Sequence, residues 1–135
     1  MEENFNDGII KEFRASGGSV GGMFSGMELL LLTAKGAKSG AERTTPLAYT
    51  RDNDDYVIIA SYGGAAKHPA WFHNLKANPD VTVEVGTERF AATAHIAGPT
   101  ERERLFKAQA AVYPQFNEYQ KKTTREIPVV VLKRH

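Results

Sequence analysis

The fold of this chain is set by the stretch Leu29-Leu-Leu-Leu-Thr-Ala-Lys-Gly-Ala-Lys-Ser-Gly-Ala-Glu-Arg-Thr-Thr-Pro-Leu-Ala-Tyr49. Apolar residues lead into a short loop of small and hydroxyl-bearing residues and then out of it again. This pattern predicts two strands, over residues 28–34 and 44–51, joined by a turn.

The predicted turn is locally basic. It sets Lys35, Lys38 and Arg43 against a single acid, Glu42. Backbone N–H groups and cations in such a turn bind phosphate or carboxylate groups. We therefore expect the turn to hold the anionic tail of a bound cofactor.

The rest of the chain continues as short strands with a few helices. Alternating or continuous apolar runs, bounded by turn residues, predict the further strands, and helical periodicity predicts the helices. Thr100 and Glu103 have the spacing of a capping box for the third of these helices. Six strands with few helices indicate a small, partly open antiparallel barrel. The further strands are expected at 56–61, 81–85 and 127–132, with a partner strand after the Gly86-Thr87 turn that carries Phe90, Ala92, Ala94 and Ile96 on one face. The helices are expected at 3–14, 69–77, 100–112 and 114–121.

The amino-acid composition argues against several classes of protein function. A chain of 135 residues is expected to form one domain. Its 17 basic and 16 acidic side chains are nearly balanced, which argues against a nucleic-acid-binding surface. It has no cysteine, so disulfides and thiolate ligands are excluded. No apolar run approaches the ~20 residues of a membrane helix, and the acidic N-terminus does not resemble a signal peptide. A cytoplasmic location is expected.

The first 27 residues leave two questions open. Phe5, Ile9, Ile10 and Phe13 form one apolar stripe of the predicted helix. This stripe either packs on the barrel, which we favour, or makes peripheral contact with a membrane. The following glycine-rich segment, residues 17–22, is either a connector or a lid over a bound ligand.

The chain offers little acid–base or metal chemistry of its own. Its four histidines lack the spacing of a metal site, and His68 and His73, five residues apart, would lie on different faces of a helix. Motifs of hydrolases and of phosphate-binding P-loops are absent. If the protein is an enzyme, the reactive atoms belong to a bound cofactor.

Two further groups are candidates for ligand binding. Trp71 and Asn74 share a helix face just after Ser61-Tyr-Gly-Gly64, where a strand end exposes backbone N–H groups. A second group, Tyr113, Phe116 and Tyr119, is a stripe of aromatic residues that forms either core or a substrate wall.

Two long motifs carry a family resemblance. They are Leu29-Leu-Leu-Leu-Thr-x-Lys-Gly-x-Lys-Ser-Gly-x-x-Arg-x-x-Pro-Leu47 and Ser61-x-Gly-Gly-x-x-Lys-His-Pro-x-Trp-x-x-Asn-Leu-x-Ala-Asn-Pro79, and shorter matches occur at Glu12–Gly22 and Tyr113–Tyr119. In these motifs the chain resembles the deazaflavin (coenzyme F420)-dependent nitroreductase and quinone reductase family.

The resemblance implies a mainly β, α+β fold. We expect a split β-barrel of about six antiparallel strands with flanking helices. Residues 1–135 would form a single F420-binding domain, with residues 1–27 as its N-terminal helix and glycine-rich segment. The implied reaction is hydride transfer from reduced F420 to a quinone-like, nitroaromatic or other activated small-molecule acceptor.

The resemblance also implies residue roles. Lys38, Ser39 and Arg43 would bind the phosphate and oligoglutamate tail of F420. The full set of implied cofactor-binding residues is Ala37, Lys38, Ser39, Arg43, Thr44, Thr45, Pro46, Leu47, Ala60, Ser61, Tyr62, Ala70, Trp71 and Asn74. The acceptor would contact Tyr62, Tyr113, Phe116 and Tyr119. Ser61 and Tyr119 are the candidates for a catalytic contact, and no metal is expected.

Three positions depart from family members that reduce bicyclic nitroimidazoles. Such members can carry Tyr in place of Ala48, Lys in place of Tyr62 and Tyr in place of Phe116. The loss of these polar groups is expected to affect nitroimidazole reduction more than quinone reduction. Two alternatives stay open, namely an FMN-dependent enzyme of the same barrel class and a non-catalytic F420 carrier.

Overall fold

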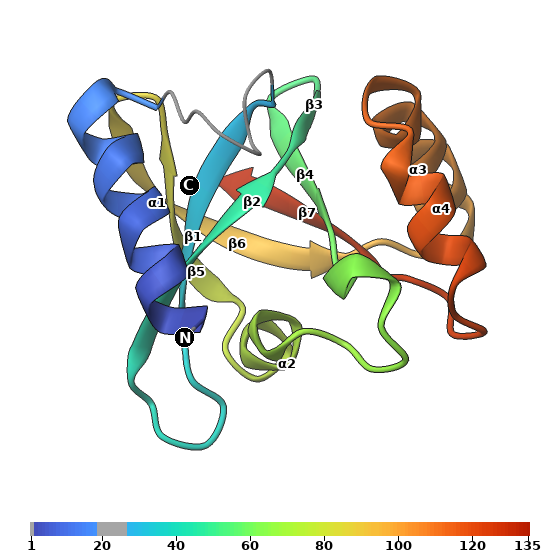
Figure 1. Ribbon diagram of the computed structural model, residues 1–135, viewed down its shortest axis with the longest axis horizontal. Coiled ribbons are helices and arrows are strands. Elements are labelled where there is room, and N and C mark those ends of the chain that lie inside the picture. The colour runs from blue at the N-terminus through green and yellow to red at the C-terminus, as the bar shows by residue number, and fades with distance from the viewer. Residues whose placement is uncertain (1, 19–26) are drawn as a thin grey trace.

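The structure is a computed structural model that describes residues 2–18 and 27–135. The described residues form helices and strands in the order α1 (Glu2–Ser16), β1 (Leu29–Lys35), β2 (Glu42–Ala48), β3 (Thr50–Asp52), β4 (Asp55–Ile59), the 3-10 helix η2 (Tyr62–Gly64), α2 (Ala70–Ala77), β5 (Asp80–Val85), β6 (Glu88–Ile96), α3 (Pro99–Val112), α4 (Gln115–Lys121) and β7 (Val129–Arg134) (Figure 1).

The strands form one antiparallel sheet in the order β2-β1-β5-β6-β7-β4-β3. Its two edge strands, β2 and β3, are consecutive in the chain and are separated by Tyr49 alone. The sheet must therefore curl until its edges approach, which produces the expected partly open barrel. The predicted strand over 44–51 is corrected to two strands, because the chain leaves one edge at Tyr49 and joins the other at Thr50.

The four leucines of β1 are buried because both faces of this strand are covered. Leu30 and Leu32 point into the barrel, where they pack with residues of β4, β5, β6 and β7. Leu29 and Leu31 point outward and pack against Ile9, Ile10 and Phe13 of α1. Burial on both faces explains why a continuous apolar run forms a strand here.

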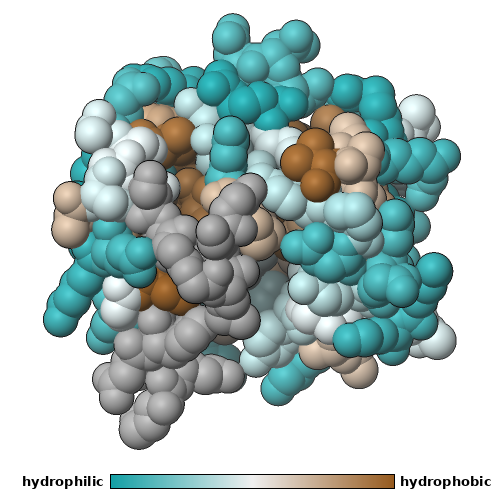
Figure 2. All heavy atoms as spheres, turned by 45° about the horizontal axis from the view of Figure 1, so that its top comes forward, coloured by the Kyte–Doolittle hydropathy of each residue, from teal (hydrophilic) through white to brown (hydrophobic). Residues whose placement is uncertain are grey.

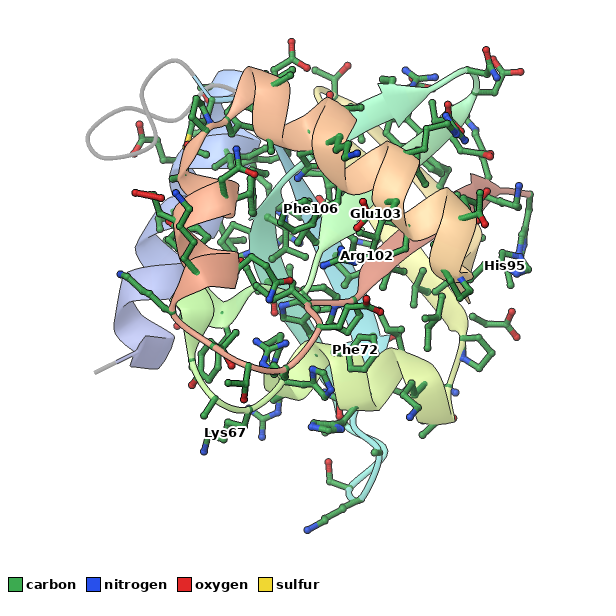
Figure 3. All side chains as sticks on the ribbon, turned by 90° about the vertical axis from the view of Figure 1, so that its right-hand side faces the viewer. Lys67, Phe72, His95, Arg102, Glu103 and Phe106 are labelled. Atoms are coloured by element: carbon green, nitrogen blue, oxygen red, sulfur yellow. The ribbon has the colours of Figure 1, made fainter. Side chains whose placement is uncertain are left out.

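The helices cover different parts of the curled sheet (Figure 1). The second helix, α2, lies below the sheet in this view and contributes Trp71, Phe72 and Leu75 to the interior cluster. On the opposite side from α1, α3 and α4 bury Leu105, Phe106 and other side chains against the outer face of β4 and β7. Figure 3 shows Arg102 and Phe106 on the side of α3 that faces the sheet.

The first helix is two residues longer at its C-terminal end than the prediction and begins one residue earlier. Its buried side chains confirm packing on the barrel for Ile9, Ile10 and Phe13. A bidentate pair from Arg14 to Glu84, at 2.8 and 3.0 Å, fastens its C-terminal end to β5. The side chain of Phe5 and residues 19–22 of the glycine-rich segment lie outside the described residues.

Apolar exposure on the described surface is limited. The large apolar side chains exposed there are Tyr62, Ile96 and Val112. On the face shown in Figure 2, brown residues occur as small separate groups between hydrophilic ones. Within the described ranges, the helices are too short and too polar to cross a bilayer.

The capping box predicted at Thr100 is wrong. The third helix begins at Pro99 with Gly98 as its N-cap, and Thr100 is already helical. Proline suits this first position because its fixed φ matches the helix and its missing N–H would have no helical acceptor. Glu103 instead contacts Arg102 and Lys107.

Candidate functional site

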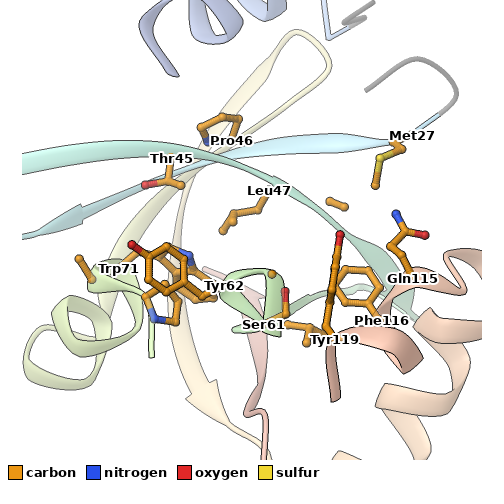
Figure 4. A pocket seen from close by; sticks show the side chains of 15 residues that line it. Met27, Thr45, Pro46, Leu47, Ser61, Tyr62, Trp71, Gln115, Phe116 and Tyr119 are labelled. Carbon is orange, nitrogen blue, oxygen red and sulfur yellow. The ribbon is translucent and has the colours of Figure 1, made fainter. Parts of the chain in front are cut away.

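A pocket of about 590 Å³ lies between β2 and the segment that follows β4. Strand β2 forms one wall, and the other is built by η2, the start of α2 and α4 (Figure 4). The lining residues are Met27, Thr45, Pro46, Leu47, Ala48, Ile59, Ser61, Tyr62, Gly63, Pro69, Ala70, Trp71, Gln115, Phe116 and Tyr119. Thr45 and Trp71 mark one end of this pocket, and Met27, Gln115 and Tyr119 mark the other.

The basic hairpin lies beyond the Thr45 end. Thr45 is three positions after Glu42, the first residue of β2, which corresponds to about 10 Å along a strand. Lys35 is opposite Glu42 in the β1–β2 register, and Lys38 is exposed in the turn between them. A ligand that fills the pocket and extends past Thr45 therefore reaches the cationic turn.

The turn is fixed in shape. Gly36 N–H donates to the carbonyl of Ala41 at 2.8 Å, and Ala41 N–H donates to the hydroxyl of Ser39 at 3.2 Å. Ala37 N–H donates to Oδ1 of Asn74 at 3.0 Å. The last bond ties the hairpin to α2, so Asn74 acts on this region by holding the turn rather than by lining the pocket.

The opposite wall is a strained loop. Tyr62, Gly63 and Gly64 have φ values of 48°, 64° and 85°, three left-handed residues in succession. Tyr62 is the costly member, because a side chain disfavours this region. The loop turns the hydroxyl of Ser61 into the pocket, as Figure 4 shows, while Ala60 is fully buried in the core.

The far end of the pocket is aromatic. The rings of Phe116 and Tyr119 meet edge to face, with centroids 5.6 Å apart. The expected third member, Tyr113, does not line this pocket. Its hydroxyl accepts a hydrogen bond from Glu28 N–H at 3.0 Å, and its ring lines a separate cavity of about 690 Å³. The separation of Tyr113 from Phe116 has a local cause, because Tyr113 is the C-cap of α3 and the helix breaks before Phe116.

The structure brings most of the predicted site residues together. Nine of them line the pocket, namely Thr45, Pro46, Leu47, Ser61, Tyr62, Ala70, Trp71, Phe116 and Tyr119. Ala37, Lys38, Ser39 and Arg43 belong to the hairpin beyond its end. Thr44 points elsewhere, with its hydroxyl 2.7 Å from that of Thr33.

Sequence reasoning missed six lining residues: Met27, Ala48, Ile59, Gly63, Pro69 and Gln115. Ala48 continues the predicted Thr45–Leu47 segment, and Gly63 and Pro69 lie within the second long motif. The sequence therefore contained a signal by which these three lining residues could have been predicted. Met27 and Gln115 gave none, because only the tertiary fold brings them to the Tyr119 end.

The histidines do not form a metal centre. Within residues 2–18 and 27–135, no three His, Asp or Glu side chains gather as metal ligands. His68 lies beside the ring of Phe72 and the guanidinium of Arg125. Burial, followed by the charges of Arg125, His73 and Lys76, lowers the pKa of His68. His68 is therefore neutral at neutral pH.

Comparison with known proteins shows the family. The family model described as F420H(2)-dependent quinone reductase matches residues 9–134. An F420H(2)-dependent quinone reductase of Mycobacterium tuberculosis is 44% identical over 126 residues, covering 90% of this chain and 85% of the relative.

Two solved structures are similar along most of their length. An F420-H2 dependent reductase shares 42% identity with a TM-score of 0.72, covering 78% of this chain and 93% of the other. A domain-swapped dimer shares 35% identity with a TM-score of 0.74, covering 98% and 100%. On the family match and the identity to these relatives, the chain belongs to the F420H(2)-dependent quinone reductase family.

Proposed function

We propose that this oxidoreductase binds reduced F420 in the pocket beneath β2 and reduces a quinone-like acceptor at its Tyr119 end. The proposal rests on the different chemical character of the two ends of the pocket. One pocket has a cationic, hydroxyl-rich hairpin beyond one end and an aromatic wall at the other. A cofactor with an anionic tail and a planar ring matches this order.

The residues present fit such a cofactor. A volume of about 590 Å³ lies within the range of small-molecule sites, which are mostly apolar with a few polar groups. Pro46, Leu47 and Trp71 offer flat apolar contact to a ring system. Lys38 and Arg43 offer charge to phosphate and carboxylate groups. When bound, reduced F420 supplies the hydride.

The chain supplies binding and orientation. Hydride transfer needs the acceptor held close to the donor ring, which walls on both sides of the pocket achieve without an acid–base residue. Phe116 and Tyr119 would stack against the acceptor. The hydroxyl of Ser61 or Tyr119 would donate a hydrogen bond to the acceptor oxygen as negative charge develops there. A proton from solvent completes the reduction.

Quinones are favoured over nitroimidazoles as acceptors. Ala48 and Phe116 present no hydroxyl to this end of the pocket, and Tyr62 presents no ammonium group. A nitro group presents two neighbouring oxygens that need donors together, whereas each quinone carbonyl presents a single oxygen. Nitroaromatic compounds remain the second acceptor class of the proposal.

The test is oxidation of reduced F420, followed by recovery of its absorbance. We expect turnover with a soluble quinone such as menadione and slower turnover with a bicyclic nitroimidazole. Tyr119→Phe should lower turnover of the acceptor while leaving F420 affinity nearly unchanged. Tight binding of F420 without turnover of any acceptor in a broad panel would instead favour a carrier protein.

A further inference from the structure

We infer that Arg125, which does not line the pocket, is the positioning residue that holds its Ser61–Gly64 wall. This inference rests on the proposed function, because the pocket it shapes is the proposed F420 site. Arg125 lies in the loop between α4 and β7, about 60 residues further along the chain than the wall it contacts.

The guanidinium of Arg125 contacts both ends of the strained loop. Its Nε donates to the carbonyl of Ala65 at 2.9 Å, and its Nη2 donates to the carbonyl of Ser61 at 2.9 Å. Both Nη atoms lie 3.3 Å from the carbonyl of Ala60, and Nη1 lies 3.0 Å from Nδ1 of His68. A rigid, planar fork of five N–H donors can hold these three carbonyls and the imidazole nitrogen together, whereas an ammonium group has only three donors.

The loop requires such a clamp because its own conformation is unfavourable. Three successive left-handed residues include one with a side chain, Tyr62, and such positions persist only when surrounding contacts enforce them. The loop is also pressed against α4, since a Cβ on Gly64 would lie 2.7 Å from the carbonyl of Tyr119. Arg125 and α4 thus both hold the loop.

Arg125 is itself fixed by a partly buried network. Its carbonyl accepts a hydrogen bond from Nε2 of Gln120 at 2.8 Å, and Oε1 of Gln120 accepts one from Nη2 of Arg102 at 2.7 Å. Arg102, labelled in Figure 3, is buried and also donates to the carbonyl of Ile127 at 3.0 Å. The clamp is therefore anchored in the helices α3 and α4 and does not depend on an exposed side chain.

His68 makes the clamp sensitive to acid. Its Nδ1 accepts from Arg125 only when it carries no proton, and the groups that face it, Arg125, His73 and Lys76, are all basic. Because the pKa of His68 is lowered in the fold, its contribution is complete above the ordinary histidine pKa of about 6.5. That contribution is lost as the pH falls from there through the lowered value.

The test compares Arg125→Ala and Arg125→Lys with the matched control Arg104→Ala, which removes an exposed arginine paired with Asp52. Both Arg125 variants should bind F420 about tenfold to a hundredfold more weakly, because affinity falls in proportion to the fraction of molecules whose wall keeps the binding-competent shape. Amide hydrogen exchange should quicken at residues 61–68 in these variants and stay unchanged elsewhere. Millimolar guanidinium should restore part of the F420 affinity of Arg125→Ala.

His68→Asn tests whether His68 causes the loss of F420 affinity in acid. An asparagine oxygen can take the place of Nδ1 and accepts at any pH, so this variant should keep its F420 affinity as the pH falls below about 6.5, while the affinity of the wild type declines as His68 takes up a proton. Equal acid sensitivity in both proteins would overturn the role of His68.

The two proposals fail differently. If Arg125→Lys binds F420 as tightly as the wild type and its amide hydrogen exchange at residues 61–68 is unchanged, the positioning role is overturned. The proposed function is then left intact. Absence of F420 binding by the wild type would overturn the proposed function, and the exchange measurement would still decide whether Arg125 holds the loop.

Discussion

Asn74 connects two parts of the site that lie 37 residues apart in the chain. Its Oδ1 is the acceptor that ties Ala37 in the hairpin turn to α2. Asn74→Ala should lower the free energy of unfolding by about 1 kcal/mol, the usual net value of one hydrogen bond. It should also weaken F420 binding, because the cationic turn is no longer held beside the pocket. Calorimetry and a fluorescence titration measure the two effects.

The matched control is Asn117→Ala, which removes an exposed asparagine from α4. It should leave F420 affinity unchanged. Unaltered affinity in Asn74→Ala would show that the turn needs no tether.

Substitution of Gly63 and of Gly64 distinguishes the cost of backbone strain from the cost of steric contact. Both have positive φ, but a Cβ on Gly63 meets nothing within 4 Å, whereas one on Gly64 meets the backbone of Tyr119. Gly63→Ala should cost about 1–2 kcal/mol of stability from conformational strain alone. Gly64→Ala should cost about 1–3 kcal/mol more, because α4 must move. Denaturant unfolding of the two variants gives the comparison, and equal costs would mean that the loop is not wedged against α4.

The hairpin between β1 and β2 is the element that should recognise the charged tail. Lys38→Ala should weaken F420 about twofold to fivefold, as for a single exposed ion pair. An F420 analogue without the phosphate and glutamate tail should bind both proteins equally. The matched control is Lys107→Ala on α3, remote from the hairpin. Equal losses for F420 and the tail-free analogue would contradict the tail role of the hairpin.

Helix α1 is held to β5 by Arg14 and Glu84. The hydrogen bonds from Arg14 lower the pKa of Glu84. Since the pKa of Glu84 in the folded protein lies below the ordinary glutamate value of about 4.3, the ion pair stabilises the fold fully at pH values above about 4.3. Its contribution is lost as the pH falls through the folded pKa.

Glu84→Gln should therefore cost about 1 kcal/mol or less near neutral pH, because Arg14 is half exposed and screened. The difference from wild type should shrink as the pH falls below about 4.3 and vanish once the pH lies below the folded pKa of Glu84. Urea unfolding across this pH range measures it, with Glu88→Gln, from an exposed pair with Arg134, as the control. If the free energies of unfolding of Glu84→Gln and the wild type still differ in acid, the cost of the substitution comes from packing and not from the ion pair.

Prediction from sequence succeeded for elements defined by local patterns. The leucine run of β1, the alternating valines of β5 and the proline and glycine breaks placed most strands and helices within a few residues. It failed where tertiary geometry decides. Nothing local marks Tyr49 as the point where the chain changes sheet edge, and the aromatic spacing of Tyr113 and Phe116 hides a helix break.

At the scale of the whole molecule, the curled sheet creates the site. The sheet carries β2 at one edge and returns β4 near its other edge, so the Thr45–Ala48 segment faces the loop that follows β4. Residues of the pocket thus come from positions 27 to 119, brought together by non-local strand pairing. The motifs indicated which segments take part, and only the fold shows that the cationic turn and the aromatic wall lie at opposite ends of the pocket.

The most direct test of this account is a fluorescence titration of the purified protein with oxidised F420 and, separately, with FMN, at low and high salt. We expect one F420 bound per chain, more tightly than FMN, with an affinity that falls as salt screens the hairpin cations. Preference for FMN, or F420 affinity that does not change with salt, would contradict it.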